Sequence, residues 1–160
     1  MDPVRSGLAG GAAATGVLLL FLLTVDLALG GTNLFVLTTF ASLCTIGGPP
    51  YCQLGSVTAT LLTGIVFLSL FVVAWPLLFT GFTWGLPGES GAVHGVMFGA
   101  VIWLGYAATV WIAVFRGWEE LSATLPILAA MLLAYLVYGL VLGGVYDRLA
   151  AHRTLMSTEA

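Results

Sequence analysis

Apolar residues fill four long stretches of the chain, and short segments rich in glycine, proline and charged residues separate them. A helix needs roughly 20 apolar residues to cross a hydrocarbon core of about 30 Å. All four stretches reach that length, and the last three contain no charged residue. The pattern therefore predicts a single transmembrane domain over residues 1–160, with spans at about residues 8–29, 54–80, 92–115 and 125–146.

A fifth apolar segment, NLFVLTTFASLCTI at residues 33–46, is too short to cross a bilayer, because a helix of this length extends only about 21 Å. Its Thr38, Ser42 and Thr45 share one helical face. The segment is expected to lie in the outer interface or to re-enter the bundle, and the pattern leaves both open. The predicted fold class is all-α, an integral membrane four-helix bundle with a short extra helix between the first two spans.

Composition indicates that the bilayer is the solvent of this chain. Hydrophobic residues make up 60% of it and charged residues only 7%, whereas a soluble domain carries about 25% charged residues. The net charge is −3, with four arginines and no lysine. Nucleic-acid binding is excluded, because neutralising phosphates requires a clustered basic surface.

The arginines predict the orientation of the spans. Arg5 precedes the first span, and Arg148 and Arg153 follow the fourth. Because positive residues favour the cytoplasmic side, we expect a multi-pass protein of the plasma membrane with both termini in the cytoplasm. Residues 1–30 also fit a secretory signal peptide, but the apolar tract begins at Leu8 and is long for one. Near the cytoplasmic side, Pro76 predicts a kink in the second span.

Small residues recur in the spans at four-residue spacing, which allows helices to approach closely in lipid. The third span has Gly91, Gly95 and Gly99, and the fourth has Gly139 and Gly143. In an antiparallel pair of helices the two sets lie at similar depth. We therefore predict that Gly95 and Gly99 face Gly143 and Gly139 across a helix–helix contact.

Cys44 and Cys52 flank a Gly-Gly-Pro-Pro turn on the predicted external side, where disulfides persist. A turn can bring the two within bonding range, and the closed loop would stabilise the fold by about 2.5 kcal/mol in the chain-entropy model. We predict a disulfide here. A zinc site is less favoured, because no further Cys or His lies nearby, and a redox C-x-x-C motif is absent.

Two ionisable residues in the spans are candidates for function, because such groups are costly in lipid. His94 is one turn into the third span, and Asp26 lies near the external end of the first. The ordinary alternatives are a His94 bonded to Tyr146, to a backbone carbonyl or to a headgroup, and an Asp26 that only marks the end of its span. Tyr138 and Tyr146 are expected to turn their hydroxyls toward other helices.

The spans contain neither a recognisable catalytic constellation nor a metal-binding cluster. A haem held between helices normally takes two axial ligands. Apart from His94, the chain has only His152, which lies beyond the fourth span. We therefore expect no catalytic residue, no metal and no cofactor.

Three stretches carry a family resemblance: GLAGGAAATG at residues 7–16, GAVHGVMFGAVIWL at 91–104 and YLVYGLVLGGVYDRL at 135–149. They resemble an uncharacterised family of small four-span membrane proteins, common in halophilic archaea and also found in bacteria. The resemblance covers nearly the whole chain and implies a fold without an activity. It also implies a histidine in the last span of many members, where this chain has Tyr135, so that a metal role becomes doubtful here.

Three functions remain open. The leading hypothesis is a non-enzymatic integral membrane protein, a packing or accessory subunit that associates with itself or with other membrane subunits, for instance those of a respiratory complex. The second is a pathway for a small solute or ion, lined by Thr63, Tyr106 and Thr109 together with the inward-facing tyrosines. The third is a haem- or metal-binding redox subunit that uses His94.

Overall fold

The computed structural model describes residues 2–28, 57–84, 90–117 and 125–150, and the regular structure in these ranges is helical throughout. Four helices in the described ranges are long and apolar enough to cross a membrane. This confirms the predicted all-α fold with four candidate spans. The expected short helix at residues 33–46 lies outside the described residues.

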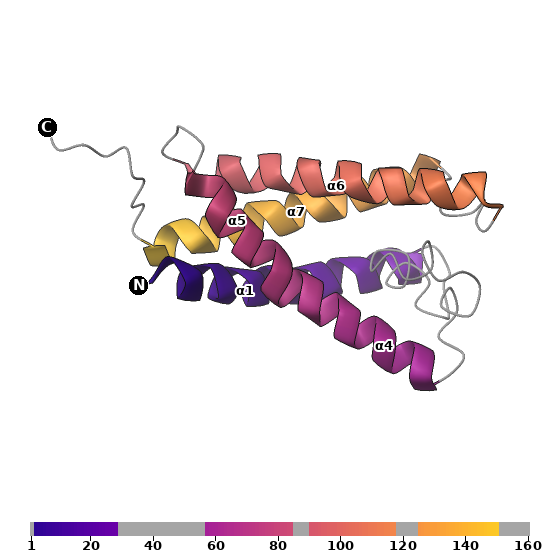
Figure 1. Cartoon of the computed structure of the whole chain (residues 1–160), viewed down its shortest axis with the longest axis horizontal. Coiled ribbons are helices and arrows are strands. Elements are labelled where there is room, and N and C mark those ends of the chain that lie inside the picture. Colours follow the sequence, from indigo (N-terminus) through magenta and orange to yellow (C-terminus); the bar gives the residue numbers. More distant parts are fainter. Residues whose placement is uncertain (1, 29–56, 85–89, 118–124, 151–160) are drawn as a thin grey trace, which may run out of the picture.

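The second of the four helices consists of three consecutive segments. The helices are α1 (Pro3–Ala28), then α4 (Val57–Leu68), η2 (Ser69–Ala74) and α5 (Trp75–Trp84) in one continuous rod, then α6 (Gly91–Phe115) and α7 (Leu125–Ala150). The N-terminal end of α1 and the C-terminal end of α7 lie at the same end of the bundle (Figure 1). Both helices continue beyond the predicted spans on that side.

α7 lies along both α6 and α1, and these three helices run side by side (Figure 1). The second helix crosses them obliquely. Its α5 segment packs against α1, whereas α4 diverges from the other helices (Figure 1). Only 22% of the span Val57–Thr83 is buried, against 33–39% of the other three spans. α4 is therefore the part of the bundle least covered by other described residues.

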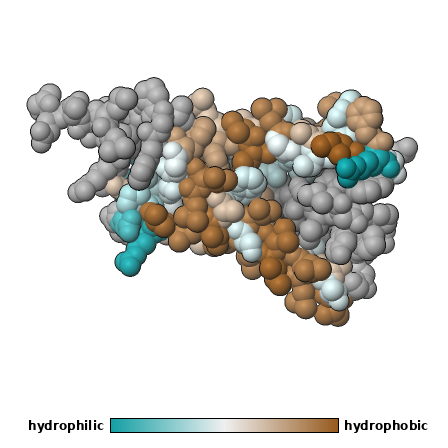
Figure 2. Space-filling model, in the orientation of Figure 1, coloured by the Kyte–Doolittle hydropathy of each residue, from teal (hydrophilic) through white to brown (hydrophobic). Residues whose placement is uncertain are grey.

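The surface between the two ends of the bundle is apolar. Figure 2 shows hydrophobic residues along its middle and hydrophilic ones toward the ends. Large side chains such as Leu20, Leu61 and Trp111 are exposed. By contrast, the buried residues include the polar Ser6 and Thr63. Apolar side chains face outward and polar ones inward, as expected when lipid surrounds the helices and offers no hydrogen-bond partner.

The second helix changes its winding directly before its proline. In η2 the helix is wound as a π-helix, and the Trp75 N–H donates to the Leu70 carbonyl five residues earlier. The next donor in this pattern would be residue 76, a proline without an N–H. Pro76 therefore cannot donate to the Phe71 carbonyl. Where the sequence predicts a kink at Pro76, the structure has a π turn directly before the proline.

The π turn keeps one face of the second helix directed inward. Along α4 and into η2, the buried positions follow each other at four-residue spacing. They are Ala59, Thr63, Phe67 and Phe71, and the next buried residue is Pro76, five positions later. A five-residue step matches the wider turn of a π-helix. Both α4 and α5 thus contribute buried residues to the same side.

Candidate functional site

The backbones of α6 and α7 touch along a line of glycines. Gly139 lies between Gly95 and Gly99: a Cβ on Gly139 would collide with the Gly95 carbonyl oxygen and come within 3.1 Å of the Gly99 nitrogen. Gly143 lies in the same way between Gly91 and Gly95. In lipid, such close approach is a main source of helix association, because apolar burial gives helices no preference for each other.

Gly99, at one end of this line, has a different partner. A Cβ on Gly99 would meet the backbone of Tyr135 rather than that of another glycine. α1 uses small residues in a similar way: Gly11 lies against the ring of Pro76, and Gly10 lies against the Leu142 carbonyl, 3.1 Å from the position of an added Cβ. Small residues therefore occupy contacts of α1 and α6 with their neighbours.

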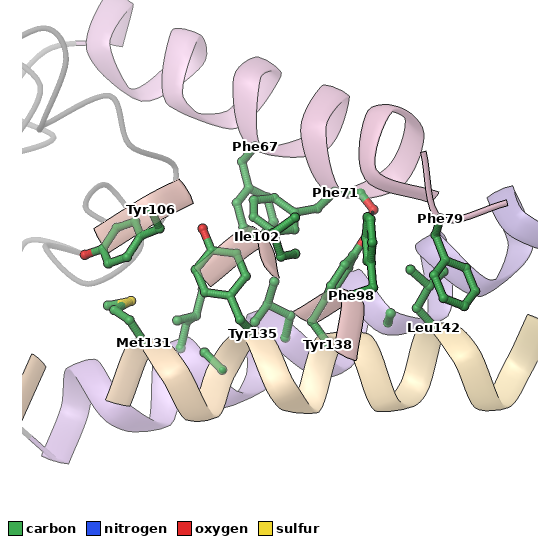
Figure 3. Close-up of a cluster of buried hydrophobic side chains, with 14 of the residues drawn as sticks. Phe67, Phe71, Phe79, Phe98, Ile102, Tyr106, Met131, Tyr135, Tyr138 and Leu142 are labelled. Carbon is green, nitrogen blue, oxygen red and sulfur yellow. Dashed lines mark hydrogen bonds between the residues drawn. The ribbon is translucent and has the colours of Figure 1, made fainter. Parts of the chain in front are cut away.

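Tyr138 of α7 joins the fourth helix to the π turn. Its side chain is completely buried, and its hydroxyl donates a hydrogen bond of 2.6 Å to the Phe71 carbonyl. This is the carbonyl to which residue 76, a proline, cannot donate. The Tyr138 ring also meets the Phe71 ring edge-on, with centroids 5.2 Å apart. Figure 3 shows Tyr135 and Tyr138 directed from α7 toward Phe67 and Phe71 of the second helix.

A cavity of about 430 Å³, open to the surface beside the exposed Val101 and Gly105, lies where the second helix diverges from α6 and α7. Its walls are mainly aliphatic and aromatic side chains. The lining residues are Leu70, Trp75, Val101, Ile102, Gly105, Tyr106, Thr109 and Tyr135. Two residues of the predicted solute pathway, Tyr106 and Thr109, line this cavity, whereas Thr63 does not. The Thr109 hydroxyl donates to the Tyr106 carbonyl at 2.7 Å, so its hydrogen is already used within the helix.

The candidate ionisable residues lie apart from that cavity. His94 and Asp26 are both buried, each with 5% of its surface exposed. The Tyr146 ring packs edge-on against Phe79, with centroids 5.5 Å apart. No hydrogen bond between the side chains of His94 and Tyr146 is seen in the described part of the chain.

The described residues contain no group of three or more His, Cys, Asp or Glu side chains that could hold a metal ion. His152, Cys44 and Cys52 lie outside the described ranges. The expected disulfide is therefore not supported by the structure. For the redox hypothesis, His94 is the only histidine among the described residues that could bind a haem or a metal.

A carboxylate that the sequence pattern did not single out caps α6. The side-chain oxygen Oδ2 of Asp147, on α7, accepts a hydrogen bond of 3.0 Å from the Gly91 N–H at the start of α6. The preceding residue, Ser90, is exposed and contributes its backbone carbonyl to the His94 N–H. A cap from another helix has no local signal in the sequence, because the two residues lie 56 positions apart.

We expect Asp147→Ala to lower the free energy of unfolding by about 1 kcal/mol, because an amide at the N-terminus of α6 loses its acceptor. Asp147→Asn keeps an oxygen acceptor and should lose less. Unfolding in mixed micelles, followed by circular dichroism, measures both changes. Equal stability of Asp147→Ala and the unmodified protein would contradict the capping role.

A family model described as "Family of unknown function (DUF6789)" matches residues 1–157. No curated protein and no solved structure matches.

Proposed function

We propose that this chain, which belongs to the DUF6789 family of unknown function, is a non-enzymatic integral membrane protein that serves as a packing or accessory subunit by associating with further copies of itself. The observation that carries the proposal is the outward face of α1. Ala9, Ala12, Ala13 and Gly16 lie on this face, and all are exposed. A Cβ added to Gly16 would meet no atom within 4 Å.

The outward face of α1 suits contact with a second α1. The four positions follow i, i+3, i+4 and i+7 spacing, so they form one strip along the helix. Small residues facing lipid gain little there, whereas between helices they let backbones approach closely. In a parallel, two-fold related pair each residue lies opposite its own copy at the same depth, so the strip is complementary to itself.

The distribution of arginines supports a proposal for the location and orientation of the chain. We infer that the protein lies in the plasma membrane with both termini in the cytoplasm. Arg5 and Arg148 are near the end of the bundle that holds both chain ends, and Arg116 follows α6 at the opposite end. The positive-inside rule favours the cytoplasm for the end with more arginines.

We expect Gly16→Leu to weaken self-association at least tenfold, or about 1.4 kcal/mol, because the larger side chain separates the two α1 backbones. Light scattering coupled to size-exclusion chromatography in a mild detergent gives the molar mass over a range of protein concentrations. Gly81→Leu is the matched control. Gly81 is also exposed, and a Cβ there meets nothing within 4 Å.

The proposal predicts that the unmodified protein and Gly81→Leu form the same oligomer, while Gly16→Leu dissociates at a higher concentration. A monomer at every concentration would contradict self-association. An oligomer that Gly16→Leu leaves intact would place the interface elsewhere than on α1.

A further inference from the structure

Two residues of opposite charge, Asp2 and Arg5, stand at the N-terminal end of the outward face of α1, and both are exposed. Counted back from Ala9, Arg5 lies four positions earlier and Asp2 seven. At helical spacing both therefore continue the strip of small residues on this face. We call this strip of small residues the α1 strip; it consists of Ala9, Ala12, Ala13 and Gly16.

The start of the helix fixes where these two charges are placed. The Asp2 carbonyl oxygen accepts a hydrogen bond of 3.0 Å from the Ser6 N–H, so the backbone of Asp2 belongs to the first turn of α1 although the helix itself begins at Pro3. Neither the Asp2 carboxylate nor the Arg5 guanidinium forms an ion pair with another side chain in the described part of the chain. Both charges are thus available to a partner.

The sizes of the side chains determine where two copies of α1 come closest. Beyond Gly16 the same outward face carries Leu20, Leu23 and Leu27, all of them exposed. Large side chains hold two helix backbones apart, whereas small ones let them approach. Two α1 helices in contact through the α1 strip therefore converge toward their N-terminal ends, where Asp2 and Arg5 lie.

A parallel pair with two-fold symmetry brings the opposite charges together. Asp2 and Arg5 are three residues apart, which is a rise of about 4.5 Å along the helix, a distance that the long arginine side chain can span. A contact between Asp2 of one copy and Arg5 of the other is repeated by the symmetry, with the two copies exchanged. The charged end of this face is therefore complementary to itself.

We propose that Asp2 and Arg5 form two intermolecular ion pairs at the N-terminal end of an α1–α1 interface and that these pairs make self-association sensitive to ionic strength. The partner is a second copy of this chain. This inference rests on the proposed function, because it requires that the α1 strip is the surface through which the copies associate.

Charge reversal in the full chain tests the ion pairs. Asp2→Arg leaves only positive charges at this end of the interface and should raise the dissociation constant about tenfold, since attraction is replaced by repulsion. The double variant Asp2→Arg/Arg5→Asp restores opposite charges in the reverse order and should return the constant to within about threefold of that of the unmodified protein. Sedimentation equilibrium in an uncharged detergent measures all three constants.

Val4→Arg is the matched control for an added positive charge at the same end of α1. Val4 is exposed, but at about 100° per residue it lies roughly 140° around the helix from Ala9, away from the α1 strip. Its dissociation constant should equal that of the unmodified protein. The double variant also keeps the net charge of the natural sequence, so it controls for any effect of total charge.

Salt gives a second measurement that does not depend on how well a variant folds. Raising the ionic strength from about 0.05 M to about 0.5 M screens attraction and repulsion alike. The unmodified protein should therefore associate more weakly at high salt, whereas Asp2→Arg should associate more strongly. General damage to the fold would not reverse the direction of the salt effect.

An unmodified oligomer that neither salt nor Asp2→Arg weakens would overturn the ion pairs and leave the α1 interface standing, as would a double variant that fails to recover. Asp2 and Arg5 would then face water or lipid headgroups. A protein that is monomeric at every concentration would instead contradict self-association itself, so the two failures are distinguishable. Should Asp2→Arg not fold, the salt dependence of the unmodified protein decides.

Discussion

Gly95→Leu is expected to lower the free energy of unfolding by about 3 kcal/mol or more. A Cβ at this position would collide with the Gly139 carbonyl oxygen and lie 3.1 Å from the Gly143 Cα. These are backbone atoms, so no rotamer change relieves the collision and the two helices must separate. Overpacking of interiors typically costs about 1–3 kcal/mol, and more where the surroundings cannot yield.

Titration with a denaturing detergent, followed by circular dichroism, measures this loss of stability. Gly64→Leu and Gly81→Leu introduce the same side chain into open space, so they control for the general effect of leucine in a helix. Gly139→Leu should resemble Gly95→Leu, and the double variant should lose less than the sum, because either change alone separates the same contact. A fully stable Gly95→Leu would refute the role of this contact.

Tyr138→Phe should lower the free energy of unfolding by about 1–3 kcal/mol, the cost of leaving a buried polar group without its partner. The variant keeps the ring beside Phe71 and removes only the hydroxyl that donates to the Phe71 carbonyl. Tyr146→Phe is the control, since it also loses only a hydroxyl while its ring stays against Phe79.

The Pro76→Ala variant tests whether the Tyr138 hydroxyl takes the place of the backbone donor that proline lacks. Alanine restores a backbone N–H at the position where the π turn lacks one, so the Phe71 carbonyl regains a donor within its own helix. Tyr138→Phe should therefore cost less in the Pro76→Ala background than alone. A double-mutant cycle from detergent unfolding measures the difference. Equal costs in both backgrounds would show that the Tyr138 hydroxyl does not replace the donor lost at Pro76.

The number and nature of the helices could be predicted because they depend on uninterrupted apolar length, which is a local property of the sequence. Membership of a family of unknown function is likewise confirmed by the match over residues 1–157. In the glycine contact, Gly139 touches both Gly95 and Gly99. Matching the depths of glycines on neighbouring spans predicts such a meeting, but its detailed register depends on how the helices are tilted.

The cavity and the cap of α6 by Asp147 could not be predicted in the same way. The cavity arises because α4 and η2 diverge from α6. The angle between two helices cannot be deduced from the sequence of either helix alone. Trp75 alone predicts an ordinary membrane tryptophan, and Gly105 alone predicts a packing position. Pro76 did not point to the contact of Tyr138 with Phe71, because in a regular α-helix a proline at this position removes the donor to the Val72 carbonyl. Phe71 takes the place of Val72 only because η2 is wound as a π-helix.

The five-residue step at η2 affects which positions of the second span face inward. Ala59, Thr63, Phe67 and Phe71 follow a four-residue spacing, and the same spacing continued past Phe71 would select the half-buried Trp75 and miss the buried Pro76 and Thr80. Counted instead from Pro76, the buried positions Pro76, Phe79, Thr80 and Thr83 follow the i, i+3, i+4 and i+7 spacing of a single α-helical face.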